Sequence, residues 1–267
     1  MKSFILLAIT ILTWNTHRMG DYKKPEQNEV LQYLLSQDAD VVCLQEVELF
    51  KSDRYLTLPE VREALGRKYH YSYIDFARYD SWHQFGLMVW SKYPLINKQT
   101  LPYEWGGNLS DRCDIVVGKD TIRLINNHLE SYSFTSKDLE EFDQKHNYEG
   151  LKATYYRLKE KWSRAIPRRN EQARVVRKEI ETSPYPVIVV GDFNSIELSY
   201  AYWEISRGLH DAWRSLHPFQ YGATCEHRGF GVRIDYILSS NPIKPTACTV
   251  TKAGGSDHAP VVATLEW

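Results

Sequence analysis

Residues that can bind metals or move protons follow several apolar runs of this sequence. Runs of this kind predict buried strands, and a strand holds the residues at its end rigidly enough to build a site. All of the candidates are Asp, Asn, Glu or His, and they are Asn15, Glu46, His128, Asp192, Asn194, Asp235, Asp257 and His258. The sequence therefore predicts one site assembled from residues far apart along the chain.

These residue types favour hydrolysis of a phosphate ester. The chain has no Gly-x-Ser-x-Gly or cysteine nucleophile and no glycine-rich phosphate loop. A pair of glycosidase carboxylates is conceivable but needs no asparagine and histidine partners. Carboxylates with an asparagine suit a hard cation such as Mg²⁺ or Mn²⁺, and histidines suit proton transfer and stabilisation of an anionic oxygen. Phosphate-ester hydrolysis uses a metal, a base and cationic donors of this kind.

Each residue also has a structural interpretation when it is taken alone. Asparagine is common in turns, so Asn15 could be a turn residue, Glu46 could cap a loop, and Asp192 could make an Asx-turn. Asp235 lies in an apolar run, where a buried carboxylate needs a partner, although that partner can be purely structural. The order of all the segments along the chain decides between the two interpretations.

Six segments, taken together and in order, resemble the endonuclease/exonuclease/phosphatase family. They are Thr13-Trp14-Asn15, Leu44-Gln45-Glu46-Val47, Asn127-His128-Leu129, Gly191-Asp192-Phe193-Asn194, Arg233-Ile234-Asp235-Tyr236 and Ser256-Asp257-His258-Ala259-Pro260-Val261. The family includes deoxyribonuclease I, apurinic endonucleases, neutral sphingomyelinases and inositol polyphosphate 5-phosphatases. The resemblance covers the chain from residue 10 to its C-terminus. It implies an α/β fold, the four-layer α/β/β/α sandwich, in which two packed mixed sheets are flanked by helices and share one active site at an edge.

The resemblance also implies a metal site. Glu46 is then the chief ligand, with Asn15 beside it and Asp257 near the metal, directly or through water. The implied cofactor is Mg²⁺, with Mn²⁺ as a substitute.

The remaining roles concern the water and the phosphate. The resemblance implies that Asp192, helped by Asn194, orients or deprotonates the attacking water. His258 contacts the scissile phosphate, Asp235 fixes its ring through the far nitrogen, and His128 donates to a phosphate oxygen. That orientation follows the logic of a base–carboxylate pair.

Two arginines are further candidates for holding a substrate phosphate through a bidentate contact. Arg18 comes three residues after Asn15, and Arg112 precedes an apolar run. A surface salt bridge is the competing interpretation for each.

Composition sets wider bounds on the function. The 267 residues carry a net charge of −1, which argues against tight, sequence-blind binding of long nucleic acids but allows a local basic groove. The four cysteines are scattered without a CxxC pair, which argues against a zinc site.

The hydrophobic pattern predicts alternating helices and strands. Helices are expected at 26–35, 59–66 and 168–181, and strands at 5–14, 41–44, 86–90, 121–126, 187–190, 234–238 and 261–265. A helix, a breaker, four apolar residues and an acid occur at 26–46 and again at 168–192. This echo indicates two similar halves packed face to face, with chance as the alternative. The apolar N-terminal run favours a buried strand over a targeting segment because no cleavage site precedes Asn15.

Residues 131–170 differ from the rest of the chain. They are rich in Lys, Glu, Arg, Tyr and Trp and show no strand pattern, so we expect a lengthened helical insertion within a single catalytic domain spanning residues 1–267. Basic residues at 159–178 indicate either a solvated helix face or a surface for a phosphate-rich partner. Four aromatic residues are candidates for stacking on a base, covering a lipid or packing in the rim, and they are Trp82, Trp105, Tyr132 and Phe134.

The expected activity is metal-dependent hydrolysis of a phosphodiester, as in a nuclease or another phosphodiesterase. The alternatives are a phosphomonoesterase or sphingomyelinase-like phospholipase on the same site, and an inactive binding module, which would have lost at least one site residue. The substrate is then a nucleic acid, a small molecule or a lipid head group. No protein partner is evident, and a monomer is expected. The sequence leaves open whether the protein is exported or belongs to a membrane-attached precursor.

Overall fold

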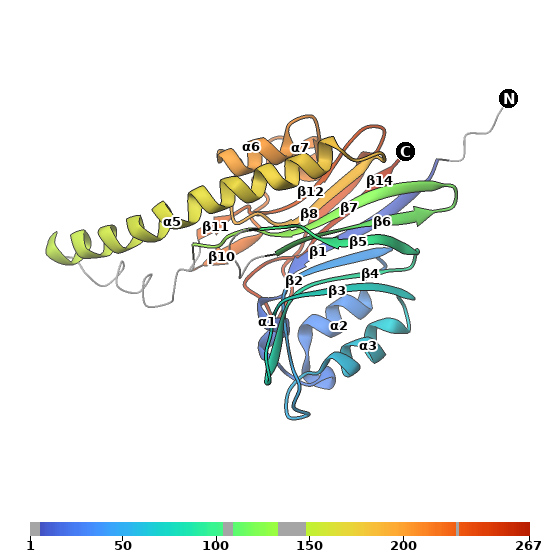
Figure 1. The fold of residues 1–267 in the computed structure, drawn as a ribbon, viewed down its shortest axis with the longest axis horizontal. Coiled ribbons are helices and arrows are strands. Elements are labelled where there is room, and N and C mark those ends of the chain that lie inside the picture. Colours follow the sequence, from blue (N-terminus) through green and yellow to red (C-terminus); the bar gives the residue numbers. More distant parts are fainter. Residues whose placement is uncertain (1–5, 104–108, 133–147, 228–229) are drawn as a thin grey trace.

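Two six-stranded mixed sheets pack face to face in the computed structural model (Figure 1), which describes residues 6–103, 109–132, 148–227 and 230–267. The first sheet has the order β13 (Lys244–Val250), β14 (Val261–Glu266), β1 (Ala8–Asn15), β2 (Val41–Phe50), β4 (His83–Ser91) and β3 (Tyr71–Tyr79). The second has the order β5 (Leu95–Thr100), β6 (Leu109–Val117), β7 (Asp120–His128), β8 (Val187–Asp192), β12 (Asp235–Ser239) and β9 (His210–Asp211). A separate hairpin pairs β10 (Cys225–His227) with β11 (Phe230–Val232).

Helices cover the outer faces of both sheets, so the molecule has four layers (Figure 1). On the first sheet lie α2 (Glu29–Ser36) and α3 (Leu58–Gly66), and on the second lie α5 (Tyr148–Glu181) and α6 (Tyr200–Ser206). The shorter elements are α1 (His17–Asp21), the 3₁₀ turn η1 (Pro25–Gln27) and α7 (Ala212–Leu216). The expected four-layer α/β/β/α sandwich is confirmed.

The central strands are apolar throughout because both of their faces are buried. In β2, Val41 and Cys43 face the core between the sheets, whereas Val42 and Leu44 face the helices. The same alternation divides β1 and β8 between the middle core and an outer core. A strand buried on both faces reads as a continuous apolar run, which is the pattern that predicted these elements.

The sequence echo reflects a repeated strand arrangement. In the first sheet β1 and β2 form a parallel pair between the antiparallel neighbours β14 and β4. In the second, β7 and β8 form a parallel pair between β6 and β12. A helix lies between the two parallel strands along the chain in each half, α2 in one and α5 in the other. The prediction of two similar halves is confirmed, and the parallel strand ends place their following loops at a common edge.

Helix α5 is much longer than the predicted helix at 168–181. It begins at Tyr148 and runs through Pro167, and the buried apolar side chains of its described part, such as Ala173 and Val176, lie in its second half. Lys, Glu, Arg and Leu are good helix formers, which favours extension of the helix toward Tyr148. The part of the expected insertion at 133–147 lies outside the described residues.

The N-terminal run and the cysteines have simple structural roles. The N-terminal apolar run forms β1 from Ala8 onward, as a strand rather than a separate segment. All four cysteines are free thiols. Within the described residues, no helix combines the length and the apolar character needed to cross a membrane.

A polar cluster interrupts the middle layer near the strand ends. Gln45 on β2 donates to Asn126 Oδ1 on β7 at 2.7 Å, and Asn126 is the register partner of Asp111 on β6. Asp111 is fully buried, and neither of its carboxyl oxygens has a hydrogen-bond partner among the described residues. Burial, with a smaller contribution from the charge of Asp75, raises the pKa of Asp111 well above its usual value.

Replacing Asp111 with Asn should therefore stabilise the protein increasingly as pH rises. The folded state holds the Asp111 proton, whereas the unfolded chain releases it above about pH 4. Stability contributed by such a raised pKa is complete below pH 4 and is lost above it, and the amide has no proton to lose. Urea unfolding of Asp111→Asn and wild type from pH 4 to pH 8 measures the difference.

The matched control is Asp38→Asn, because Lys92 lowers the pKa of this exposed carboxylate. Its effect on stability should be small and of opposite sign. A stability difference for Asp111→Asn that stays constant with pH would show that Asp111 ionises normally in the folded protein.

Candidate active site

The predicted site residues lie where strands of both sheets meet at one edge. Asn15 ends β1, and Glu46 lies on the adjacent parallel strand β2. In the second sheet the register places His128, Asp192 and Asp235 side by side on β7, β8 and β12. Because β12 is antiparallel to β8, its first residue meets the last residue of β8. Residues from distant parts of the chain thus form one row.

A buried hydrogen bond joins the two sheets at this edge. Asn15 Nδ2 donates to Asp192 Oδ2 at 2.9 Å and to Glu46 Oε1 at 3.1 Å. Burial opposes ionisation of Glu46, but the hydrogen bond and charge of His128 and the amide of Asn15 outweigh it and lower the pKa of Glu46 to about 2. Glu46 is therefore a carboxylate at any physiological pH.

Asp192 is an almost fully buried carboxyl group in the middle of the row. It is 1% exposed and accepts hydrogen bonds from the backbone N–H and the side-chain Nδ2 of Asn194, at 2.7 and 3.2 Å. Burial and the charge of Asp235 raise the pKa of Asp192 to about 6, against the opposing effects of His258 and His128. A carboxyl group with such a pKa can exchange a proton near neutral pH.

His258 is held in place from three directions. Its Nδ1 lies 2.9 Å from Asp235 Oδ2, and its carbonyl accepts a hydrogen bond from the Trp14 indole at 2.8 Å. Ser256 Oγ accepts from the His258 N–H and donates to the Asn15 carbonyl. Burial opposes the imidazolium form, but the charge and hydrogen bond of Asp235 outweigh it and raise the pKa of His258 well above its usual value. Its Nε2 lies 4.0 Å from Asp192 Oδ2.

His128 faces the same carboxylates from the other side. Its Nε2 lies 3.3 Å from Glu46 Oε1 and 4.0 Å from Asp192 Oδ2. Burial lowers the pKa of His128, but the hydrogen bond and charge of Glu46 outweigh it, so the pKa is raised overall. Two imidazoles with raised pKa values therefore flank the carboxyl groups, an arrangement that can hold an anionic substrate and transfer protons.

Comparison with known proteins now identifies the family. A family model described as Endonuclease/Exonuclease/phosphatase matches residues 12–258. The chain belongs to the endonuclease/exonuclease/phosphatase family. Among curated protein sequences, none matches this chain. The family's enzymes are phosphoesterases that generally depend on divalent metals.

Solved structures of this family share the fold at low sequence identity. A family protein from Beutenbergia cavernae DSM 12333 is 18% identical, with a TM-score of 0.71, over 97% of this chain and 71% of its own. D. rerio TDP2 complexed with single strand DNA product is also 18% identical, with a TM-score of 0.64, over 97% of this chain and 98% of its own. Sphingomyelinase C from Streptomyces griseocarneus is 16% identical, with a TM-score of 0.61, over 97% and 99%.

A β-bulge in β2 lies at Glu46. The strand was expected to end at Glu46, but it continues to Phe50, and its register with β4 shifts between Leu44 and Val47. Glu46 itself has φ +50°, a conformation that few non-glycine residues adopt. Such bulges redirect single side chains and often lie beside active sites. The pattern of apolar residues before Glu46 gave no sign of the continuation.

Asp257 lies at the rim rather than in the buried row. Its Oδ1 is 3.1 Å from His17 Nδ1, and both side chains are nearly half exposed. The hydrogen bond to Asp257 raises the pKa of His17, with a smaller contribution from the charge of Glu46. His17 was not predicted as a site residue. Its only signal in the sequence is its position two residues after Asn15.

The two arginine candidates have different surroundings. Arg18 is more than half exposed at the rim, 3.7 Å from Glu48, and is hydrogen-bonded to Tyr22. Arg112 lies three residues along β6 from the strand end and pairs with Glu179 of α5 at 2.9 Å. The structure does not bring Arg112 to the site, because the acid on α5 holds it; the salt-bridge interpretation applies.

The two aromatic candidates within the described residues lie in different surroundings. Trp82 is 75% exposed in the turn between β3 and β4, and the Tyr132 ring lies 4.1 Å from the Arg169 guanidinium carbon. Trp105 and Phe134 lie outside the described residues. Phe85, which was not predicted, has its ring centroid 6.4 Å from that of His128.

The donor set fits a divalent metal. Three overlapping groups of side chains could each hold a metal ion, because the ligand atoms of each group lie within 4.8 Å of one another. The groups are Glu46, His128 and Asp192; Asp192, Asp235 and His258; and Cys225, Asp257 and His258. The ionised Glu46, the Asn15 amide and the half-exposed Asp257 offer oxygen donors that a hard cation prefers. Candidate acidic and histidine metal-binding groups are thus present, although none of the three joins Glu46 to Asp257.

A buried arginine that was not predicted supports the strand carrying Asp235. Arg233 is 2% exposed and donates to Asp211 through both terminal nitrogens, at 3.1 and 2.8 Å, and to Glu197 at 2.8 Å. The Tyr236 hydroxyl donates to the Arg233 carbonyl. This network fixes the backbone two residues before Asp235.

Arg233→Met should lower the free energy of unfolding by about 3–5 kcal/mol, because it leaves buried carboxylates without their cation. Arg214→Met is the matched control: Arg214 also pairs with Glu197, but it is half exposed and should contribute only about 0–1 kcal/mol. Chemical denaturation of both variants measures the two values. Equal losses would mean that the buried pair does not anchor this region.

Proposed function

We propose that this protein is a magnesium-dependent phosphodiesterase, with Mn²⁺ as a substitute, that acts on a nucleic acid or a related diester. The row of His128, Asp192 and Asp235 across three neighbouring strands, with His258 against Asp235, carries this proposal. It combines a carboxyl group able to exchange a proton with two imidazole donors for phosphate oxygens. The same chain supplies every residue, which fits a monomer.

The metal is assigned to the oxygen donors at the mouth of the row. Glu46 is the chief ligand because it stays ionised, with Asn15 beside it and Asp257 near the metal. A bound Mg²⁺ neutralises charge on phosphate oxygens and favours the attack of water.

Asp192 is proposed to orient the attacking water and accept its proton. Its pKa of about 6 leaves it largely ionised at neutral pH, while Asn15 and Asn194 fix the direction of its carboxyl group. The Asn194 amide in turn donates to the Leu129 carbonyl at 3.0 Å. Asp192 is therefore rigid enough to hold a nucleophile in line.

The two histidines are proposed to bind the phosphate oxygens. With Nδ1 of His258 committed to Asp235, its Nε2–H is left to donate to the phosphate, and His128 Nε2 donates from the opposite side. Water forms the new P–O bond, the bond to the leaving oxygen breaks, and that oxygen takes up a proton. The products are a phosphate monoester and an alcohol.

Two similar structures support different diester substrates. D. rerio TDP2 was solved in complex with a single strand DNA product, whereas the Streptomyces enzyme is a sphingomyelinase C. A sphingomyelinase-like phospholipase therefore remains the second candidate, together with a phosphomonoesterase on the same site. An inactive binding module is disfavoured because every expected site position is filled.

His258→Ala and Asp192→Ala should each reduce kcat for bis-(p-nitrophenyl) phosphate by about 10²–10⁴-fold with the fold intact, since each removes acid–base or electrostatic stabilisation of the transition state. Steady-state kinetics of purified variants measures the loss, and circular dichroism checks the fold. Glu63→Ala, on the exposed surface of α3, is the control. Near-wild-type turnover by either site variant contradicts the assigned roles.

Removal of divalent metal with EDTA should abolish hydrolysis, and added Mg²⁺ should restore it. Glu46→Gln should raise the Mg²⁺ concentration needed for half-maximal rate at least about 10-fold, since removal of a ligand charge weakens a hard-cation site. A panel of p-nitrophenyl phosphate, plasmid DNA, RNA and sphingomyelin then distinguishes the candidate substrates. Full activity in EDTA would overturn the metal assignment.

A further inference from the structure

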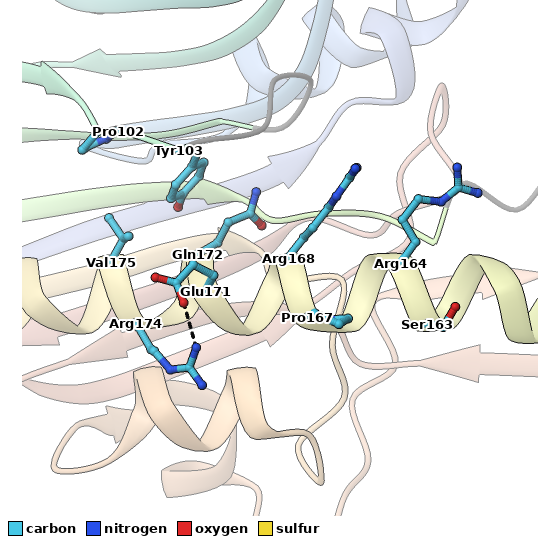
Figure 2. A pocket seen from close by; sticks show the side chains of 10 residues that line it. All are labelled: Pro102, Tyr103, Ser163, Arg164, Pro167, Arg168, Glu171, Gln172, Arg174 and Val175. Carbon is cyan, nitrogen blue, oxygen red and sulfur yellow. Dashed lines mark hydrogen bonds and ion pairs between the residues drawn. The ribbon is translucent and has the colours of Figure 1, made fainter.

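A groove outside the catalytic row runs between α5 and the segment that follows β5. Its volume is about 710 Å³. Figure 2 shows its lining, with Tyr103 descending from the sheet toward the helix and Arg164 and Arg168 rising from the helix on one side. The lining residues are Pro102, Tyr103, Ser163, Arg164, Pro167, Arg168, Glu171, Gln172, Arg174 and Val175.

The groove has more cationic than anionic groups. Arg164, Arg168 and Gln172 are four residues apart, so they share one face of α5. Arg168 pairs with Glu130 at 3.2 Å, and Arg174 pairs with Glu171 at 2.7 Å and points away from the groove (Figure 2). Arg164 has no ion pair within the described part of the chain. One guanidinium is therefore available to an anionic ligand.

Gln172 adds a buried donor without a partner. The side chain is 1% exposed, and its Oε1 accepts the Glu130 N–H at 2.7 Å, which fixes the orientation of the amide. The other amide atom, Nε2, has no hydrogen-bond partner among the described residues. Burying a donor without an acceptor costs about 1–3 kcal/mol. An anionic oxygen in the groove would supply that acceptor.

The groove is connected to the catalytic row by short hydrogen-bonded links. Glu130 follows His128 by two residues, and its carbonyl accepts from Arg169 Nε at 2.7 Å. On the other wall the Tyr103 hydroxyl donates to Ser110 Oγ at 2.6 Å, and Ser110 Oγ donates to Asn127 Oδ1. Both walls are thus tied to residues next to His128.

We infer that this groove binds a phosphate group of a single nucleic-acid strand next to the scissile one. Arg164 and the Gln172 amide are the donors for that phosphate, and the Tyr103 ring offers a face for a base, since single strands bind in basic grooves lined with aromatic side chains. The inference rests on the proposed phosphodiesterase function. It assigns a local basic surface to a chain whose net charge is −1.

The test compares Arg164→Glu with Arg62→Glu, a charge reversal at an exposed arginine of α3 on the opposite face of the molecule. Binding of a fluorescein-labelled ten-nucleotide strand is followed by anisotropy in EDTA at several salt concentrations. Arg164→Glu should weaken binding about 10-fold and reduce the salt slope by roughly 0.7 for the lost phosphate contact. Arg62→Glu should leave both within twofold of wild type.

Hydrolysis with Mg²⁺ provides a second readout. Arg164→Glu should lower kcat/KM for the strand about 10-fold and leave kcat/KM for bis-(p-nitrophenyl) phosphate unchanged, because the small diester does not reach the groove. Gln172→Glu, which keeps the acceptor for the Glu130 N–H and replaces the unpaired donor, should show the same selectivity. Thermal unfolding confirms that each variant folds.

Equal effects of Arg164→Glu and Arg62→Glu on strand binding would overturn the inference. It is also overturned if Arg164→Glu removes thermal stabilisation by inorganic phosphate but leaves strand binding intact, since the groove then holds a free phosphate. Strand binding that depends on Arg164, without hydrolysis of any diester, would support the groove and refute the proposed function instead.

Discussion

The hydrogen bond from Asn15 to Asp192 is the contact on which the site depends. It joins the last residue of β1 to the last residue of β8 across two sheets at 2.9 Å. Asp192 is almost fully buried, and a buried carboxyl group without donors is costly. The Asn15 amide also donates to Glu46, so one side chain sets the spacing of both carboxyl groups. The packing of the sheets therefore determines the geometry of the chemistry.

Glu46 and Asp192 are both carboxylic acids, but their surroundings suit them to different tasks. Glu46 has a pKa of about 2 because His128 and Asn15 stabilise its charge, whereas burial and the charge of Asp235 raise the pKa of Asp192 to about 6. Carboxyl groups at such short range need cations or donors to be ionised together. Glu46 is therefore suited to binding a metal and Asp192 to exchanging a proton, so one site can combine both functions.

The sequence could indicate the residues of the buried row because each of them lies at or near the end of an apolar run. The same reasoning failed where long-range contacts decide. No residue near Arg112 in the sequence indicates that it pairs with Glu179 of a distant helix, away from the site. The bulge at Glu46 depends on pairing with β4, and α5 begins at Tyr148, well before the predicted start at residue 168. Register and ion pairs across the fold are not local properties of a sequence.

The central claim is that Asn15 and Asp192 act as one unit made by the two sheets. A double-mutant cycle with Asn15→Ala, Asp192→Ala and the double variant, measured as kcat for bis-(p-nitrophenyl) phosphate with saturating Mg²⁺, tests it directly. When two residues act as one unit, the first substitution already removes most of their joint effect on kcat. The kcat of the double variant should therefore lie less than about 10-fold below that of the slower single variant. Losses that multiply would show that the two residues contribute independently, and would contradict a site built on their contact.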